Sequence, residues 1–434
     1  MDALTAAVVL FSTFFVLLVL GVPISVGLGV ASFLTALVFL PREDATYVVG
    51  QSMNVGIESF SLLAVPLFIF AGNIMNNGGI ARRLVDLALV LAGRVPGALA
   101  HTNVVGNMLF GSLSGSAVAS AAAIGGTLHE RQKEEGYDPG FGAAVNIASA
   151  STGLLIPPTT AAIVYSTVAG GVSVSALFMA GYVPGILMGL VVMGVAYVFT
   201  RRHRYPTYDR VTAGQAAKVF LQAVPSLLLI LVVVGGIVAG VFTATEGAGA
   251  AVLYCFVLSL IYRSLTWADL RQIMTRTVVA TGVVMFLISA SSAMSWVMAY
   301  SGIPAAITDA LLSVADSRFL ILLLMVIVLL VVGTFMDITP AILIFTPIFL
   351  PIATELGMHP VHFGMVLILA MCIGTMTPPV GSVLFVATGV SEVTIEQVVP
   401  KLVPYFVGLV LLLLAITYIP ALSLGIPQWM GLLG

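Results

Sequence analysis

The chain is poor in charge and nearly free of cysteine. Charged residues make up 8% of its 434 residues, whereas they make up about a quarter of an ordinary soluble domain. Hydrophobic residues make up 60%, which excludes a soluble domain and predicts an all-α polytopic membrane protein. The net charge of −2 gives no reason to expect a nucleic-acid partner. Cys255 and Cys372 both lie in apolar segments, so neither a disulfide framework nor a cysteine metal motif is expected.

Apolar stretches long enough to form membrane helices run through the whole chain. The first residues have no basic n-region and no small-residue cleavage site, so they are expected to form a retained helix rather than a signal peptide. Hydropathy predicts spans near residues 3–20, 22–40, 60–78, 141–168, 174–200, 222–239, 241–262, 278–299, 361–389 and 402–425.

Two further apolar stretches, near 98–128 and 319–353, each carry a polar, glycine-rich tip. The tips read GSLSGS (Gly111–Ser116) and GTFMDITP (Gly333–Pro340). A stretch with such a broken centre can form one long span or a re-entrant hairpin of two half-helices.

Paired prolines interrupt two spans at matching places, Pro157–Pro158 and Pro378–Pro379. A proline has no N–H, so the carbonyl four residues earlier loses its helical donor. The carbonyls affected are those of Gly153, Leu154, Gly374 and Thr375. Unpaired backbone is tolerated at membrane depth only inside protein or around a polar cavity. Two helices broken in matching places therefore predict a binding site at the bilayer midplane.

The two halves of the chain repeat one another. Matching residues recur at separations of 219 to 223 throughout, as the numbering of these pairs shows: Gly21/Gly240, Gly79/Gly302, Asp86/Asp309, Gly111/Gly333, Gly136/Gly357, Pro139/Pro360 and Pro184/Pro404. This pattern predicts a first repeat at 1–200, a cytoplasmic linker at 201–215 and a second repeat at 216–434.

Charge placement predicts that the repeats are inverted in the membrane. If the N-terminus is outside and both tip-bearing stretches are re-entrant, every basic residue except Arg42 and Arg318 is cytoplasmic, in agreement with the positive-inside rule. The hairpin at 98–128 then opens inward and the hairpin at 319–353 opens outward, which is an alternating-access transporter plan. An amphipathic segment before each hairpin, the first at 80–93, is expected to lie along the membrane surface, with a short tilted span as the alternative.

Asp337 is the strongest candidate for binding a cation. It is a carboxylate in an apolar stretch without a basic residue, and such a group is a functional candidate by default. Pro340 also frees the carbonyl of Met336. Carboxylate, hydroxyl and carbonyl oxygens suit hard cations such as Na⁺. In the alternative, which is compatible with that role, Asp337 caps the following half-helix. Glu246 is expected to be structural.

The first tip has no acid but contains Ser112, Ser114 and Ser116. Small residues can simply permit tight helix packing, but the neighbouring break favours a cation site. No lysine or arginine is expected in the core, so bound cations and helix N-termini would hold an anionic substrate. Those N-termini are expected at Ser116, Thr159 and Pro379. The second repeat supplies the hydroxyl groups of Thr339, Thr375, Thr377 and Ser382.

These segments together resemble the large membrane subunit of TRAP (tripartite ATP-independent periplasmic) transporters, the DctM-like family. The resemblance rests on SFSLLAVPLFIFAGNIMNNGG, GSLSGSAVASAAAIGG, TGLLIPPTT, GTFMD and GTMTPPVG, and it covers essentially the whole chain. It implies two inverted repeats with hairpins, an elevator movement and Na⁺-coupled import. It also implies two partners, a small four-helix membrane subunit (Q-type) and a periplasmic substrate-binding protein (P-type).

The same resemblance implies positions for the bound ions and the substrate. One Na⁺ site falls around Ser114, Gly153, Ile156 and Pro158. A second falls around Met336, Asp337, Gly374, Thr375 and Thr377. Substrate contacts fall near Ser116, Thr159, Thr160, Thr339 and Ser382. Two or more Na⁺ ions and no organic cofactor are expected.

Three other functions are compatible with a polytopic membrane protein but fit this sequence less well. A stand-alone Na⁺/dicarboxylate symporter of the same superfamily would share the repeats, but such proteins tend to carry Ser-Asn-Thr tips where this chain has Ser-Gly-Ser. An intramembrane hydrolase would need a second membrane aspartate near Asp337 or a Ser–His pair, and neither is evident. A purely structural subunit would leave the paired breaks unexplained. The resemblance implies import of a small organic acid anion (a C4-dicarboxylate, sugar acid, keto acid or sialic acid) by a lipid-embedded protein of the bacterial inner membrane.

Overall fold

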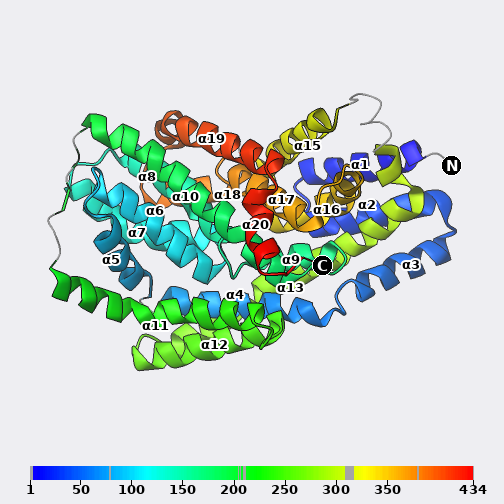
Figure 1. The fold of residues 1–434 in the computed structure, drawn as a ribbon. Helices are drawn as coiled ribbons and strands as arrows, with labels where there is room; N and C mark the ends of the chain where they lie inside the picture. The colour runs from blue at the N-terminus through cyan, green and yellow to red at the C-terminus, as the bar shows by residue number, and fades with distance from the viewer. Residues whose placement is uncertain are drawn as a thin grey trace.

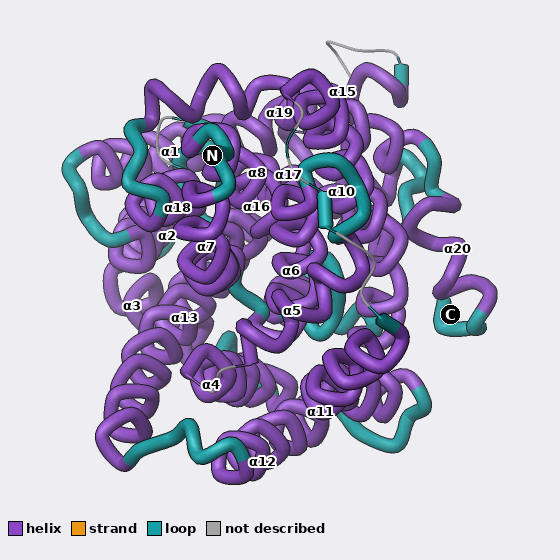
Figure 2. The backbone as a smooth tube through the Cα atoms, turned by 90° about the vertical axis from the view of Figure 1, so that its left-hand side faces the viewer, coloured by secondary structure: helices purple, strands orange, loops and turns teal. Residues whose placement is uncertain are grey.

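The structure, a computed structural model, describes residues 3–77, 80–203, 205, 207–208, 212–307, 317–378 and 381–433. All regular structure in these residues is helical, as Figure 2 shows. The predicted all-α class is thus confirmed. Pro379, Gly79, Asp309, the rest of the second arm at 308–316 and linker residues 204, 206 and 209–211 lie outside the described residues.

The first half of the chain contains ten α-helices and two 3₁₀ turns among its described residues. They are α1 (Ala3–Val19), α2 (Ile24–Phe39), α3 (Arg42–Val55), η1 (Phe60–Leu63), α4 (Ala64–Asn77), α5 (Ile80–Ala92), α6 (Ala98–Ser114), α7 (Ala117–Glu134), α8 (Pro139–Ala150), η2 (Ser151–Leu154), α9 (Thr160–Val168) and α10 (Val174–His203).

The second half has the same order of long helices, a tip-bearing pair and a broken helix. Its described helices are α11 (Ala213–Val238), α12 (Ala244–Ile261), α13 (Trp267–Ser301), α15 (Arg318–Gly333), α16 (Ile338–Glu355), α17 (Pro360–Gly374), α18 (Ser382–Val390), α19 (Ile395–Tyr418) and α20 (Ala421–Trp429).

The helices form two groups in space (Figure 1). Helix α4 packs against α12 and α13, and α11 packs against α12. In Figure 1, α4, α11 and α12 lie along the lower part of the view, and α13 runs from the centre toward α2. The two helix pairs α6–α7 and α15–α16, with the broken helices α8–α9 and α17–α18, pack on one another above them. In each pair the two helices contact one another, as a hairpin requires.

Capping boxes set the starts of three successive long helices. At α11, α12 and α13 the N-cap threonine accepts a hydrogen bond from the third helical residue, whose side chain bonds back to the N-cap. Glu246 closes one of these boxes, because its carboxylate accepts from the N–H (2.8 Å) and hydroxyl (2.9 Å) of Thr243. The structural role expected for Glu246 is the one seen here.

Within the described residues, six helices are long and apolar enough to cross a membrane, or seven if the pair α3 and η1–α4, bent by 58°, counts as one span. Three predicted spans have different limits. The span predicted at 222–239 belongs to α11, which begins at Ala213 after a capping box at Thr212. The span predicted at 278–299 belongs to α13, which begins at Trp267 because a capping box starts there. The span predicted at 402–425 is divided, since α19 ends at Tyr418 and Pro420 precedes α20. Proline has no N–H with which to continue the helix.

Candidate functional site

Each hairpin tip lies against the broken helix of its own half through a pair of glycines. A β-carbon added to Gly111 would lie 2.8 Å from the Cα of Gly153. A β-carbon added to Gly333 would lie 3.0 Å from the Cα of Gly374. Only glycine allows backbones to approach this closely. The two halves thus use matching residues to hold a tip against a break.

The two broken helices also meet one another. The hydroxyl oxygens of Ser151 and Thr375 lie 3.0 Å apart and are both buried. The thiol of Cys372 lies 3.5 Å from the carbonyl oxygen of Ser151. Both breaks, predicted from the paired prolines, are therefore present and adjacent. In the first, α8 gives way to η2 and α9 begins only at Thr160; in the second, α17 ends at Gly374 and α18 begins at Ser382.

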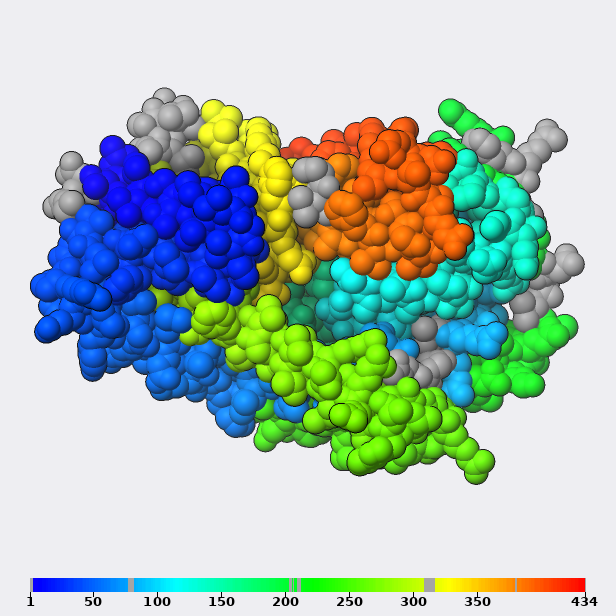
Figure 3. Space-filling model, turned by 180° about the vertical axis from the view of Figure 1, so that it is seen from behind, coloured from blue at the N-terminus to red at the C-terminus, as the bar shows by residue number. Residues whose placement is uncertain are grey.

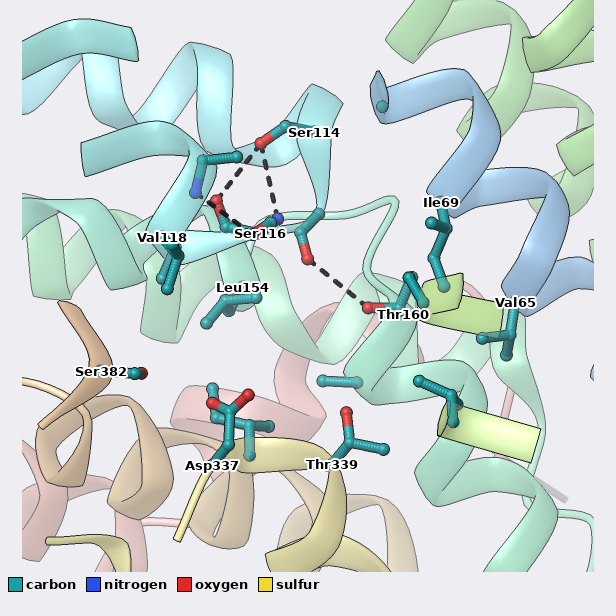
Figure 4. Close-up of a pocket in the computed structure, with 18 of the residues that line it drawn as sticks. Val65, Ile69, Ser114, Ser116, Val118, Leu154, Thr160, Asp337, Thr339 and Ser382 are labelled. Carbon is teal, nitrogen blue, oxygen red and sulfur yellow. Dashed lines mark hydrogen bonds between the residues drawn. The ribbon is translucent and has the colours of Figure 1, made fainter. Parts of the chain in front are cut away.

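A cavity of about 400 Å³ lies where the tips and breaks meet (Figure 4). It gathers seven predicted site residues from both halves of the chain: Ser114, Ser116, Thr160, Asp337, Thr339, Thr375 and Ser382. In Figure 4, Asp337 and Thr339 lie on the opposite side of the cavity from Ser114 and Ser116. We call this the first cavity.

Four helices begin at the first cavity. Ser116 is the N-cap of α7 and accepts from the N–H of Ala119 at 3.2 Å. Thr160 begins α9, Asp337 is the N-cap of α16, and Ser382 begins α18. A helix N-terminus carries roughly half an elementary positive charge. Four of them around one space favour an anionic ligand, or the anionic groups that bind a cation.

Asp337 projects into the first cavity instead of turning back to cap its helix. It occupies the N-cap position of α16, but its side chain accepts no capping hydrogen bond. Its carboxylate points into the cavity (Figure 4). The geometry therefore gives no support to a role limited to helix capping, and it leaves both carboxylate oxygens available to a cation.

The remaining predicted site residues lie beside the cavity without lining it. Gly153 and Gly374 lie in the glycine contacts. Thr159 is 2% exposed and is the N-cap of α9, where its hydroxyl accepts from the N–H of Ala162 at 3.2 Å. Thr377 donates to the carbonyl of Ile373 at 2.7 Å. The others in this group are Ile156, Pro158 and Met336.

Sequence reasoning missed three polar residues that line the cavity: Asn73, Asn76 and Arg276. Arg276 lies ten residues into α13 and was assigned to the cytoplasm, so the expectation that no basic residue reaches the core is wrong for this cavity. Asn73 donates to the hydroxyl of Thr277 at 3.0 Å, which joins α4 to α13 beside Arg276. The sequence feature that could have indicated this place is an arginine inside a long apolar helix, away from its ends.

A buried polar network joins the first hairpin to its broken helix behind the cavity. The amide nitrogen of Asn107 lies within hydrogen-bonding distance of the side-chain oxygens of Asn103 (2.8 Å), Asn146 (3.0 Å) and Ser149 (2.7 Å), which share its two N–H donors. The hydroxyl of Ser120 donates to the amide oxygen of Asn107 at 2.7 Å. Satisfied polar networks in an apolar interior fix geometry, so this one holds α6, α7 and α8 as one body.

Comparison with known proteins identifies the family. Residues 11–422 match the family model described as "Tripartite ATP-independent periplasmic transporter, DctM component". The chain is 50% identical to "Uncharacterized protein YgiK" of Salmonella typhimurium over 420 residues, covering 97% of each chain. It is 37% identical to "C4-dicarboxylate TRAP transporter large permease protein DctM" of Pseudomonas aeruginosa, covering 93% of this chain and 94% of the relative.

A solved structure supports the fold. The YdaH transporter of Alcanivorax borkumensis, described as having an unusual topology, matches with a TM-score of 0.58 and 16% identity over 90% of each chain. The apolar helices and the inner-membrane permeases of the matched family agree on an inner-membrane protein. The comparisons place the chain among transporter permeases. The chain belongs to the DctM family, the large membrane component of tripartite ATP-independent periplasmic transporters.

Proposed function

We propose that this subunit imports a small organic acid anion together with two or more Na⁺ ions. The observation that carries the proposal is the first cavity, where oxygens from both hairpin tips and the break at Thr375 surround one space. Hydroxyl and carboxylate oxygens are ligands for Na⁺. One ion would lie near Ser114 and the Gly153–Pro158 break, and a second near Asp337 and the Gly374–Thr377 break.

The substrate would bind between these ions and the helix N-termini. Arg276 adds a formal positive charge on the α13 side of the first cavity. A guanidinium can form two parallel hydrogen bonds with a carboxylate. The P. aeruginosa relative is named for C4-dicarboxylate, and a C4-dicarboxylate, sugar acid or sialic acid would carry the carboxylate that this site suits.

We further propose an elevator movement of the hairpins and broken helices past α4 and α13. The first cavity has residues of both helix groups in its lining, which supports a substrate site at a sliding interface. The glycine contacts and the Asn107 network would keep the moving group rigid. In the predicted topology, Asn73, Asn76 and Arg276 lie toward the cytoplasmic ends of their helices, so the first cavity would face inward.

The two partners proposed are a small four-helix membrane subunit and a periplasmic binding protein that delivers the anion. The test uses all three proteins, with the two partners taken from reading frames beside this one. Thermal-shift screening of the binding protein against organic acids selects the substrate. Uptake of that acid into proteoliposomes is then measured in sodium and in choline buffer.

Sodium-dependent uptake that requires the binding protein is expected. Each Na⁺ that enters across 100 mV contributes about 2.3 kcal/mol, so an imposed inside-negative potential should raise the accumulation. Equal uptake in choline would refute sodium coupling. Sodium-dependent uptake without the binding protein would instead favour a stand-alone symporter.

A further inference from the structure

A second cavity, of about 800 Å³, lies next to the first one. Four segments line both cavities at positions four residues apart. Val65 lines the first cavity and Ser61 the second, and the other pairs, in the same order, are Val164/Val168, Val284/Ile288 and Thr339/Leu343. Four residues along a helix correspond to about 6 Å. The two cavities are thus separated by about one helical turn of mainly apolar side chains.

Helix α13 lines both cavities, one after the other along its length. Arg276, Ala280 and Val284 line the first cavity, and Ile288 and Ser292 continue the same four-residue spacing in the second. Each step of four residues advances about 6 Å along a helix and turns its lining face by about 40°, so this face winds around α13 from one cavity to the other. Figure 3 shows α13 in yellow-green below a recess that cyan and orange segments border. The two cavities are therefore consecutive parts of one route along α13.

The second cavity is rich in neutral oxygen groups. Serines from four segments (α3, the start of η1, α9 and α13) line it, with the amide of Gln51, and no described basic or acidic residue does so. The hydroxyl of Ser291 has no hydrogen-bond partner, although its side chain is only 3% exposed and lines the cavity. A buried hydroxyl without a partner loses stabilising free energy, so Ser291 is poised for a ligand or water inside the cavity.

Helix ends give the two cavities opposite electrostatic character. The nine-residue α9 begins in the first cavity at Thr160 and ends in the second at Val168. Helix α3 also ends in the second cavity, at Val55 and Gly56. Each C-terminus carries roughly half an elementary negative charge.

We infer that the second cavity is an entry site for monovalent cations, at the end of the route opposite to the first cavity. Hydroxyl, amide and helix-terminal carbonyl oxygens are ligands for a hard cation, and two helix C-termini attract positive charge. Without a carboxylate in its lining, the site holds the ion weakly, as passage requires. In the predicted topology it opens outward. That the ion is Na⁺ rests on the proposed function.

The test compares two thiol reagents of similar size and opposite charge on single cysteines. Trimethylammonioethyl methanethiosulfonate is the cation, and sulfonatoethyl methanethiosulfonate is the anion. Each reagent is added to the intact complex with Ser291→Cys in right-side-out spheroplasts, and the rate of reaction is measured. Each rate is divided by the rate at Ser173→Cys, which is exposed in the loop after α9. Cys255 and Cys372 are fully buried, so the unsubstituted protein gives the background.

The cation-to-anion ratio at Ser291→Cys is expected to exceed that at Ser173→Cys by about threefold or more, from two helix C-termini. Sodium in place of choline should slow the cationic reagent. The matched control is Ser226→Cys, since Ser226 is 1% exposed, also has a hydroxyl without a partner and lies in neither cavity. It should react with neither reagent.

Three results would overturn the inference. A ratio at or below that of Ser173→Cys would mean a neutral or anion-selective space. No reaction at Ser291→Cys would mean that the second cavity is closed or filled with lipid. Reaction only in inside-out vesicles would mean that the second cavity opens to the cytoplasm. Sodium-independent uptake by the wild-type complex would refute the proposed function and leave the cation preference standing. Sodium-dependent uptake without that preference would refute only this inference.

Discussion

The hydroxyl oxygens of Ser151 and Thr375, 224 residues apart in the chain, lie 3.0 Å from one another. Each belongs to a helix that paired prolines interrupt. The contact brings the two breaks together in the interior, beside the glycines that hold the hairpin tips. The proposed ion sites on the two sides of this contact would therefore share one rigid support, which provides a physical route for coupling them.

Gly153→Ala should disrupt this support. A β-carbon there would lie 2.7 Å from the amide nitrogen of Ser112 and would also clash with Gly111. Backbone cannot move aside as a side chain can, so we expect destabilisation of about 1–3 kcal/mol and loss of sodium-dependent uptake. Thermal unfolding of the purified complex measures the first effect. The control is Gly194→Ala in α10, where an added β-carbon meets nothing within 4 Å; unfolding at the wild-type temperature by Gly153→Ala would contradict the contact.

Asp337→Asn should abolish transport while the protein still inserts and pairs with its small subunit. A cation stripped of water at the midplane needs a formal negative charge more than another neutral oxygen. The amide keeps almost the same shape, so folding should be unaffected. Ser114→Ala should weaken apparent sodium affinity by less, because it removes a neutral ligand only. The measurement is uptake against sodium concentration, with Asp269→Asn, at the exposed start of α13, as the control.

Unchanged sodium dependence in Asp337→Asn would show that the second ion site lies elsewhere. Asp337 is the one carboxylate among the described residues that line the first cavity. The same result would therefore mean that no formal negative charge in this lining contributes to sodium binding.

Arg276→Gln should lower the affinity for the organic anion. Hydrogen bonds to charged groups contribute about 1.5–3 kcal/mol, so the KM for uptake should rise by roughly ten- to a hundredfold, with little change in sodium dependence. Arg276→Lys should restore part of the affinity, since it keeps the charge and loses the planar pair of donors. Arg271→Gln is the matched control, because Arg271 lies on the same helix and lines an apolar groove instead. A KM equal to the wild-type value would exclude Arg276 from the substrate site.

Features that one helix determines by itself were predictable from the sequence, whereas features that depend on packing between helices were not. The breaks at Pro157 and Pro378 were predictable, because a missing N–H acts on its own helix. The hairpin tips were predictable from composition, because a glycine-rich polar stretch interrupts an apolar run where it occurs. The place of Arg276 was not, since it depends on which side of α13 faces the hairpins. Thr159 shows the same limit: its hydroxyl caps α9, and composition alone cannot distinguish a cap from a substrate contact.

The ion pair between Asp138 and Lys401 should make stability depend on pH. It joins the start of α8 to α19, outside the apolar part of both helices. Burial raises the pKa of Asp138, but the hydrogen bond and charge of Lys401 and the N–H of Phe141 more than offset it, so the pKa is lowered. The stabilisation is therefore present above the ordinary aspartate value, about 4, and is lost as pH falls through the lower folded value. Lys401→Gln should reduce this acid sensitivity in thermal unfolding, whereas unaltered sensitivity would show that the pair contributes nothing.

The two hairpins should be accessible from opposite sides of the membrane. Arg131 lies in the last turn of α7, and Glu355 ends α16, so each marks the base of one hairpin. If the repeats are inverted, Arg131→Cys should react with an impermeant maleimide only in inside-out vesicles, and Glu355→Cys only in right-side-out spheroplasts. Both positions are partly or fully exposed, so access to the reagent depends on the side and not on burial. Labelling of both cysteines from one side would mean that the hairpins open in the same direction, and the alternating-access mechanism proposed for this chain would then lose its structural basis.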